Sequence, residues 1–352
     1  MTKAIITVLF IVTQIAVVSA QNSDLRVEGE KHLANIKQLT FGGENAEAYF
    51  SSNGKQLIFQ SKRDGNGCDR IYSMNVDGTK TKQVSNGEGR TTCAYYFKGG
   101  KRVIYASTHS GGKDCPPEAD RSKGYVWPVY GDYELYTAKA DGTDIKRLTN
   151  SPGYDAEATV SPDGKNIVFT SERDGDLDLY TMDVDGRNVK RLTDEVGYDG
   201  GAFFSPDSKM IVYRRSSPKT EAEIKRYKEL LAQKLVVPTI FEIWVMNADG
   251  TNKRQVTKLG SASFAPFFTP DGKRIIFCTD HFDENKGPRR RQPNFDLALI
   301  NLDGTGLERM TFNGSFDGFP MFSPDGKKLV FASNRNAAKE GDTNVFIADW
   351  ID

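Results

Sequence analysis

The chain has 352 residues and carries 47 basic and 47 acidic side chains, so its formal net charge is zero. This balance excludes the strongly basic character that binding to nucleic acid or anionic membranes favours. The length allows one large domain or two ordinary ones, and 33 glycines indicate a protein rich in turns.

The first twenty residues have the pattern of a secretory signal peptide. Lys3 supplies a positive charge, residues 4–18 are mostly apolar, and small residues precede Gln21. We predict cleavage after residue 20, a lead-in over residues 21–34, and a periplasmic or secreted protein without a membrane span after cleavage. An uncleaved membrane anchor is the alternative, although the apolar run is short for a span.

A recurring unit follows, and its clearest copy covers residues 155–193. A strand-like run, DAEATV, precedes the turn SPDGK, the run NIVFTS, a second turn, the run LDLYTMDV, the hairpin turn DG and the final run VKRLT. Pro and Gly suit such turns because Pro presets φ and Gly accepts a positive φ. The β-branched and aromatic runs favour strands, so the unit is predicted to be four antiparallel strands.

The unit occurs six times. Its first turn recurs at 51–55, 97–101, 161–165, 205–209, 269–273 and 323–327, and its Asp-Gly hairpin at 77–85, 141–149, 185–193, 249–257 and 303–311. The sixth copy lacks the last strand, and NIKQLT at 35–40 matches that strand alone. We therefore predict an all-β, six-bladed β-propeller of four-stranded antiparallel blades over 35–352, closed by the N-terminal strand joining the C-terminal blade.

Three of the units carry insertions after the second strand, on one face of the predicted ring. The first insertion, 109–133, places Trp127 among tyrosines, either as an aromatic platform for a peptide or sugar or as a loop packing its own aromatics. In the second, Thr220 and Glu223 form a predicted capping box, and an apolar stripe from Ile224 to Leu235 docks on the propeller or meets a partner. The arginines at 289–291 in the third are predicted to be solvated or to contact an acidic partner.

Aligning the six units predicts which side chains meet around the central axis. The entrance of the innermost strand is polar in every unit: Asn45, Thr91, Asp155, Asp199, Ser263 and Asp317. We expect Asp155, Asp199 and Asp317 to crowd one channel mouth, where Ca²⁺ or a partner's Lys, Arg or N-terminus would neutralise them. Alternatively, they accept backbone N–H bonds and hold the loops between blades. Two residues further on, Glu47 and Glu157 are further candidate ligand-binding residues.

A second aligned position lies just after the second strand. It holds Arg63, His109, Arg173, Ser217, His281 and Arg335. The arginines are candidate ligand-binding residues or pair with carboxylates of neighbouring blades. His109 and His281 raise the alternative of a metal-dependent enzyme, but two aligned histidines do not make a metal site.

The four cysteines divide into two groups. Cys68, Cys93 and Cys115 map near the elaborated face, and one disulfide is predicted among them without a pairing being assigned. A zinc site with His109 is the alternative. Cys278 lies in the run IIFCTD and is predicted to be a buried thiol.

The repeated signature SPDGK, IVF, RDG, LY, MD, DG and LT resembles the TolB-type propeller repeat over residues 35–352. The resemblance implies a six-bladed propeller and, as in TolB, binding of the peptidoglycan-associated lipoprotein. Similar propellers precede the catalytic domains of prolyl-oligopeptidase-like hydrolases, but no Gly-x-Ser-x-Gly motif occurs here. Residues 21–34 also leave no room for the α/β domain that precedes the TolB propeller.

The function predicted from these observations is non-enzymatic binding of a protein or peptide partner in the cell envelope by an exported, monomeric propeller. The alternative is a metal-dependent polysaccharide lyase of the oligogalacturonate-lyase type, whose propellers resemble this one and carry a His-ligated metal. A structural accessory of an envelope complex is a third class, because propeller folds host many functions.

Overall fold

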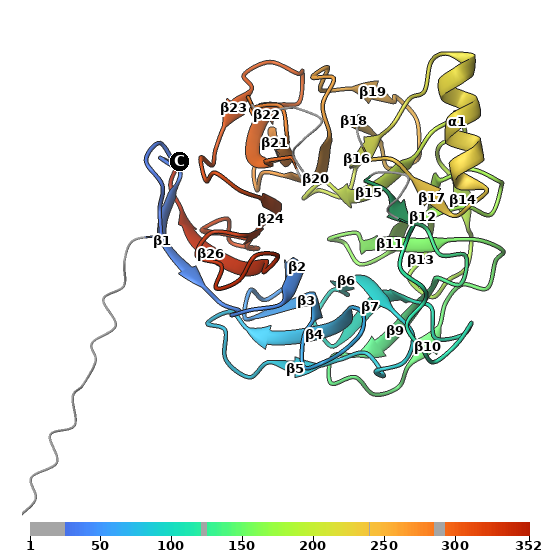
Figure 1. Ribbon diagram of the computed structural model, residues 1–352, viewed down its shortest axis with the longest axis horizontal. Coiled ribbons are helices and arrows are strands. Elements are labelled where there is room, and N and C mark those ends of the chain that lie inside the picture. The colour runs from blue at the N-terminus through green and yellow to red at the C-terminus, as the bar shows by residue number, and fades with distance from the viewer. Residues whose placement is uncertain (1–24, 121–124, 239, 285–292) are drawn as a thin grey trace, which may run out of the picture.

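The strands of the protein are arranged as blades around a central axis. The computed structural model describes residues 25–120, 125–238, 240–284 and 293–352, within which six four-stranded antiparallel sheets form a closed circle (Figure 1). The predicted all-β, six-bladed propeller is therefore confirmed. The predicted signal peptide, residues 1–20, and the arginines at 289–291 lie outside the described residues. Within the described part, no helix has the length and apolar character needed to cross a membrane.

Each blade follows the chain order from the central axis outwards. Blade 1 contains β2 (Glu44–Phe50), β3 (Gln56–Lys62), β4 (Arg70–Asn75) and β5 (Lys82–Gln83), and blade 2 contains β6 (Thr91–Tyr96), β7 (Arg102–Ser107), β9 (Glu134–Lys139) and β10 (Lys146–Arg147). Blade 3 contains β11 (Asp155–Val160), β12 (Asn166–Ser171), β13 (Asp178–Asp183) and β14 (Lys190–Arg191), and blade 4 contains β15 (Asp199–Phe204), β16 (Met210–Arg215), β18 (Glu242–Asn247) and β19 (Arg254–Gln255). Blade 5 contains β20 (Ser263–Phe268), β21 (Arg274–Thr279), β22 (Asp296–Asn301) and β23 (Glu308–Arg309).

Blade 6 combines the two ends of the described chain. Its strands are β24 (Asp317–Phe322), β25 (Lys328–Ser333), β26 (Asn344–Trp350) and, outermost, β1 (Leu33–Gln38). β1 pairs antiparallel with β26, with Leu33 opposite Trp350 and Gln38 opposite Phe346. The preceding segment is also anchored in this blade, because the buried Glu30 lies 2.9 Å from the guanidinium of Arg335.

The cores of blades 1, 2, 3 and 6 repeat the same aromatic packing between the second and third strands. Phe59 on β3 stacks on Tyr72 of β4 with 5.9 Å between ring centroids, and Phe331 on β25 stacks on Phe346 of β26 at 5.8 Å. All four side chains are at least 96% buried. Because alternate residues of a strand face opposite sides, each sheet can bury apolar side chains against both neighbouring blades.

The repeated first turn is stabilised by its own side chains. In blade 3 the hydroxyl of Ser161 donates to Asp163 at 2.6 Å, and Asp163 accepts the backbone N–H of Lys165 at 3.0 Å. Gly164 has a φ of +79°, a value that glycine adopts without steric cost. These hydrogen bonds explain why the motif Ser-Pro-Asp-Gly-Lys recurs where the innermost strand reverses into the second.

Every innermost strand contains a bulge at its third residue, or at its fourth in β2. The pairing register with the second strand shifts at this point in all six blades. The bulged residues all have a φ between +49° and +58°, and they are Glu47, Cys93, Glu157, Gly201, Ala265 and Phe319. A bulge redirects the side chain that it carries, so these six positions form a ring around the channel, which we call the bulge ring.

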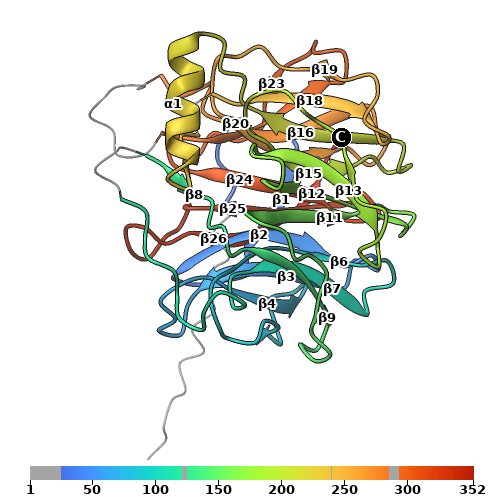
Figure 2. The ribbon, with the colours of Figure 1, turned by 90° about the vertical axis from the view of Figure 1, so that its right-hand side faces the viewer.

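The insertions gather on one side of the propeller, where Figure 2 shows α1 beside β8. β8 (Trp127–Pro128), from the insertion of blade 2, pairs with β17 (Leu235–Val236), from the insertion of blade 4. α1 (Glu221–Leu231) begins with the predicted capping box of Thr220 and Glu223. Its predicted apolar stripe is too long, because the helix ends at Leu231 and Leu235 belongs to β17.

The insertion of blade 2 is tied to blade 1 by a disulfide. Cys68 and Cys115 form this bond, so one disulfide among the three predicted cysteines is confirmed. Cys93 is a free thiol in the bulge ring, and Cys278 is buried as predicted.

Candidate functional site: the channel pocket

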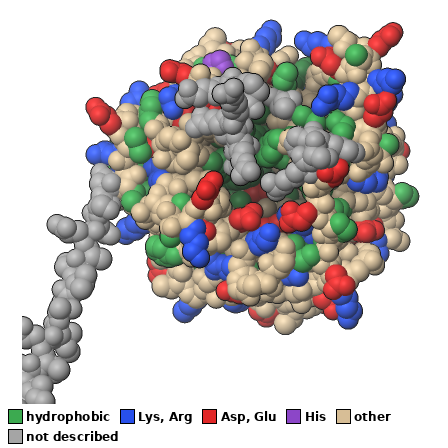
Figure 3. All heavy atoms as spheres, in the orientation of Figure 1, with side chains coloured by type: hydrophobic (Ala, Val, Ile, Leu, Met, Phe, Trp, Pro, Cys, Tyr) green, Lys and Arg blue, Asp and Glu red, His purple; other side chains and the backbone are tan. Residues whose placement is uncertain are grey.

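A pocket of about 450 Å³ opens at the mouth of the central channel. Figure 3 shows the corresponding hollow in the middle of the ring face, with acidic side chains along its lower edge. The volume lies within the range of about 300–1,000 Å³ that is typical of small-molecule sites. All six members of the bulge ring line the pocket.

The pocket wall is polar on one half and apolar on the other. Blades 1 to 3 contribute Glu47, Cys93 and Glu157 from the bulge ring, whereas blades 4 to 6 contribute Gly201, Ala265 and Phe319. The apolar half also includes the rings of Phe203, Phe264 and Phe316. A ligand that matches this wall combines a polar or charged group with an apolar body.

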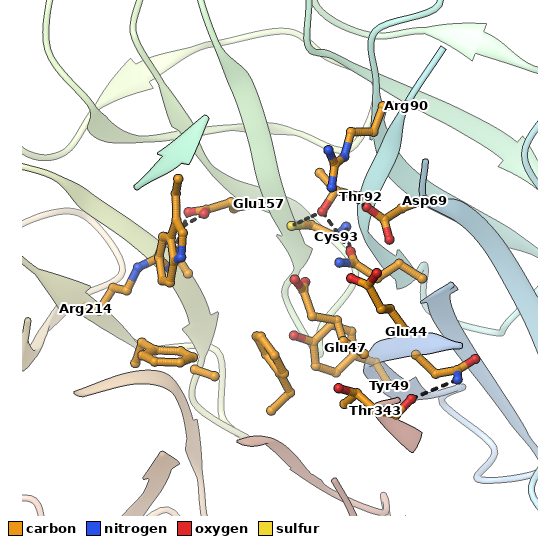
Figure 4. A pocket seen from close by; sticks show the side chains of 18 of the residues that line it. Glu44, Glu47, Tyr49, Asp69, Arg90, Thr92, Cys93, Glu157, Arg214 and Thr343 are labelled. Atoms are coloured by element: carbon orange, nitrogen blue, oxygen red, sulfur yellow. Dashed lines mark hydrogen bonds and ion pairs between the residues drawn. The ribbon is translucent and has the colours of Figure 1, made fainter. Parts of the chain in front are cut away.

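Glu157 is held as an ion by several donors. Its carboxylate accepts a hydrogen bond from Arg214 at 2.6 Å (Figure 4). It also accepts from the hydroxyl of Tyr198 at 2.6 Å and from the backbone N–H of Gly201 at 2.8 Å. Burial opposes ionisation, but the charge of Arg214 and these hydrogen bonds outweigh it and lower the pKa of Glu157. Glu157 and Arg214 therefore form a buried ion pair that bridges blades 3 and 4.

Glycine is required at the blade 4 position of the bulge ring. A Cβ atom at Gly201 would lie 2.1 Å from the Nη1 atom of Arg214, and the φ of +58° is unfavourable for other residues. The missing side chain leaves the space that the guanidinium occupies.

A second ion pair lies on the blade 1 and blade 2 side of the pocket. The guanidinium of Arg90 lies 2.6 Å from Asp69. Beside it, Gln60 accepts from the hydroxyl of Thr92 at 2.8 Å and from the backbone N–H of Cys93 at 3.0 Å. These bonds fix the backbone of β6 next to the bulge.

Glu47 differs from the other acids of the wall. Its side chain points into the pocket (Figure 4), and the thiol of Cys93 is among the groups that influence its ionisation. Burial raises the pKa of Glu47 to about 7, helped by the negative charge of Glu157 and opposed by the Cys93 hydrogen bond and the charge of Arg214. Near neutral pH this carboxyl group can therefore gain or lose a proton.

Trp127 covers the apolar half of the pocket. Its ring lies 5.6 Å from the ring of Phe264 and 5.9 Å from that of Phe241, and the guanidinium of Arg214 lies 5.6 Å from its centre. The neighbouring Tyr125 is 46% exposed and also lines the pocket. Trp127 thus packs on the propeller, as the second interpretation expects, and also lines the pocket, while its use as a platform for a peptide or sugar stays a prediction.

The predicted crowding of Asp155, Asp199 and Asp317 at a channel mouth is wrong. All three side chains are fully buried and none lines the pocket. Each lies near an arginine of its own blade: Asp155 and Arg173 at 3.1 Å, Asp199 and Arg215 at 3.6 Å, and Asp317 and Arg335 at 3.0 Å. The first residues of β11, β15 and β24 face into their blades, and the bulge two residues later lines the pocket instead.

The aligned arginines are structural partners within their own blades, which corrects the expected pairing with neighbouring blades. Arg63 donates to Asn45 at 2.9 Å, and Arg173 and Arg335 pair with carboxylates at the corresponding position. Each guanidinium also lies over an aromatic ring of the blade core, such as Arg173 over Tyr180 at 4.9 Å.

The two aligned histidines lie apart from the pocket lining. His109 accepts or donates a hydrogen bond with the hydroxyl of Ser107 at 2.7 Å and packs on Tyr136, and His281 packs on Phe282. In the part of the chain that the structure describes, no group of three or more His, Cys, Asp or Glu side chains is placed to hold a metal ion. The three aspartates already have arginine counter-charges and do not fit a shared cation, and Ca²⁺ binding elsewhere stays a prediction.

Sequence reasoning missed four charged residues of the pocket: Glu44, Asp69, Arg90 and Arg214. They lie outside the bulge ring, at the start of β2, on loops and on a second strand. One indication was present in the sequence, because the second strand of blade 4 ends in two arginines, Arg214 and Arg215, beside two consecutive glycines on the first strand.

Comparison with known proteins points to one family. The model of the TolB beta propeller domain matches residues 126–239. A TolB homolog of Chlorobium chlorochromatii is 29% identical over 142 residues, which cover 34% of this chain and 32% of that protein. A TolB homolog of Chlorobium luteolum is 27% identical over 179 residues, covering 45% of this chain and 39% of that protein. The matches thus span well under half of these relatives.

Solved structures extend the likeness to nearly the whole chain. A putative TolB from Agrobacterium tumefaciens has a TM-score of 0.57 and 19% identity, covering 88% of this chain and 91% of that one. An oligogalacturonate lyase in complex with manganese has a TM-score of 0.50 and 14% identity, covering 91% and 95%. Likeness at these identities shows the fold alone.

Fold and pocket together define a six-bladed propeller with a pocket at one mouth of its channel. Within that class, the chain is similar to the TolB-like β-propellers, because the TolB beta propeller domain matches residues 126–239 and TolB homologs are among its relatives.

Proposed function

We propose that this propeller is a binding protein of the cell envelope, which takes up part of a protein or peptide partner in its channel pocket. The observation that carries the proposal is the pocket wall itself, polar on one half and apolar on the other. The insertions of blades 2 and 4 surround the same mouth, and loops on a rigid scaffold commonly carry binding. Its likeness to TolB homologs and the signal-like N-terminus support the envelope location.

Site-specific photocrosslinking in cells that produce the protein tests this proposal. A crosslinking amino acid at Tyr125, on the pocket rim, should trap a partner. The same amino acid at Lys327, an exposed residue in the turn at the opposite end of the innermost strand, is the matched control. A partner trapped equally from both positions, or from Lys327 alone, would contradict binding at the pocket.

We also propose that β1 closes the ring, because it occupies the edge of β26 that would otherwise be open to other chains. Leu33, which is fully buried, and Ile36 supply the apolar contacts of this strand. Purified protein without residues 25–38 should associate through the exposed edge, whereas the full chain stays monomeric in light scattering. A truncated protein that stays monomeric and equally stable would contradict this role.

A further inference from the structure

One acid of the pocket wall lacks a basic partner among the described residues. Glu44 lies 3.9 Å from Lys62, Asp69 lies 2.6 Å from Arg90, and Glu157 lies 2.6 Å from Arg214. Glu47 is the fourth acid that lines the pocket, and among the described residues no basic side chain lies within ion-pair distance of it.

The backbone conformation of β2 directs the side chain of Glu47 into the pocket. Glu47 is the bulge residue of β2, with a φ of +52°, a conformation that is unfavourable for a non-glycine residue. Glycine would relieve that strain, as it does at Gly201 in blade 4. All six bulge residues share this backbone conformation, and at Glu47 it turns a desolvated carboxyl group into the cavity.

Resting on the proposed function, we infer that Glu47 binds a primary ammonium group of the ligand, while the ligand's apolar body packs against Phe264, Phe316 and Phe319. An ammonium group carries a single charge and three donors, which suits one carboxylate with no second acid free to share it. Ca²⁺ takes six to eight oxygen ligands, more than this part of the wall supplies. The apolar rings across the pocket favour an amine on a hydrophobic residue over a bare cation.

The source of the amine is the N-terminus of a chain or a lysine side chain. Both present the same ammonium group, but the amine of a chain terminus loses its proton near pH 8 and that of lysine near pH 10.4. The pH dependence of binding therefore separates them.

Binding should be linked to the protonation of Glu47. The groups that face Glu47 from other elements are Cys93 on β6, Glu157 on β11, Arg214 on β16 and Asp69 before β4. Burial holds the pKa of Cys93 well above its usual value, and Arg214 keeps that of Glu157 low, so neither changes charge between pH 5 and 8. Because the pKa of Glu47 is about 7, affinity should rise about tenfold per pH unit from pH 5 to 7 and then level off.

Isothermal titration calorimetry of the full chain with three small probes tests the inference. The probes are alanyl-phenylalanine amide with a free N-terminus, its N-acetylated form, and N-acetyl-lysyl-phenylalanine amide. We expect the two amines to bind at least tenfold more tightly than the acetylated dipeptide, with proton release at pH 7. Affinity that falls above pH 8 only for the N-terminal amine confirms the assignment for that source, and the lysine probe should retain affinity there.

Variants separate the charge of Glu47 from the shape of the pocket. Glu47→Gln should lower amine affinity at least tenfold and abolish the rise between pH 5 and 7, and Glu229→Gln on the exposed face of α1 is the control. Equal binding of the acetylated probe, or an unchanged pH profile in Glu47→Gln, overturns the ammonium assignment but leaves the pocket as a binding site. If no probe binds, the ammonium assignment is also overturned. If crosslinking from Tyr125 is absent as well, the proposed function is overturned too.

Discussion

Removing the guanidinium that neutralises Glu157 should destabilise the whole propeller. The side chains of Arg214 and Glu157 are only 6% and 11% exposed, so Arg214→Met leaves a buried carboxylate without its counter-charge. Breaking a buried pair in this way costs about 3–5 kcal/mol, whereas an exposed pair is worth about 0–1 kcal/mol. The exposed pair of Arg187 and Asp185 supplies the control, Arg187→Met. Urea unfolding followed by circular dichroism measures both free energies of unfolding.

The sign of the pH dependence makes the prediction sharper. In the wild type the pKa of Glu157 is lowered, so its contribution is present above about pH 4.3 and is lost as pH falls through the folded value. In Arg214→Met the uncompensated burial raises that pKa, so the variant loses stability as pH rises above about 4.3. The gap between the two proteins should therefore widen from pH 4 to pH 8.

Two outcomes would refute this reasoning. One is a loss at pH 8 as small as that of Arg187→Met, and the other is a gap that narrows as pH rises. Adding Glu157→Gln to Arg214→Met should recover most of the loss, because the buried charge is then gone.

Three further variants test the scaffold around the pocket. Replacing Cys68 and Cys115 by Ser should cost about 4 kcal/mol, the loop entropy for a sequence separation of 47 residues, and unfolding of the wild type with and without reductant checks this independently. Gly201→Ala should cost at least about 1 kcal/mol more than Gly175→Ala in thermal or urea unfolding, since both have a positive φ but only the first meets another side chain; equal costs would reject the clash. Leu33→Ala should cost about 2–5 kcal/mol, and a change below 0.5 kcal/mol would mean that β1 contributes little to stability.

The sequence alone determined the architecture because the repeat is encoded locally. Turns such as Ser161 to Lys165 are stabilised by hydrogen bonds between residues five or fewer positions apart, so the same letters produce the same turn in each blade. The capping box of Thr220 and Glu223 is local in the same way, and it was predicted to the residue. Six such units bury their apolar faces by packing side by side, each against its neighbours.

Only the tertiary structure decided which aligned position faces the channel. Alignment of the repeats matches Asp155 and Glu157 each with its counterparts in the other blades. It does not reveal the bulge in β11, after which Asp155 is buried within the blade and Glu157 lines the pocket. The bulge depends on pairing with the neighbouring strand, and the pair of Glu157 with Arg214 joins residues 57 positions apart. Contacts of this kind arise between blades, so their chemistry exists only once the ring has assembled.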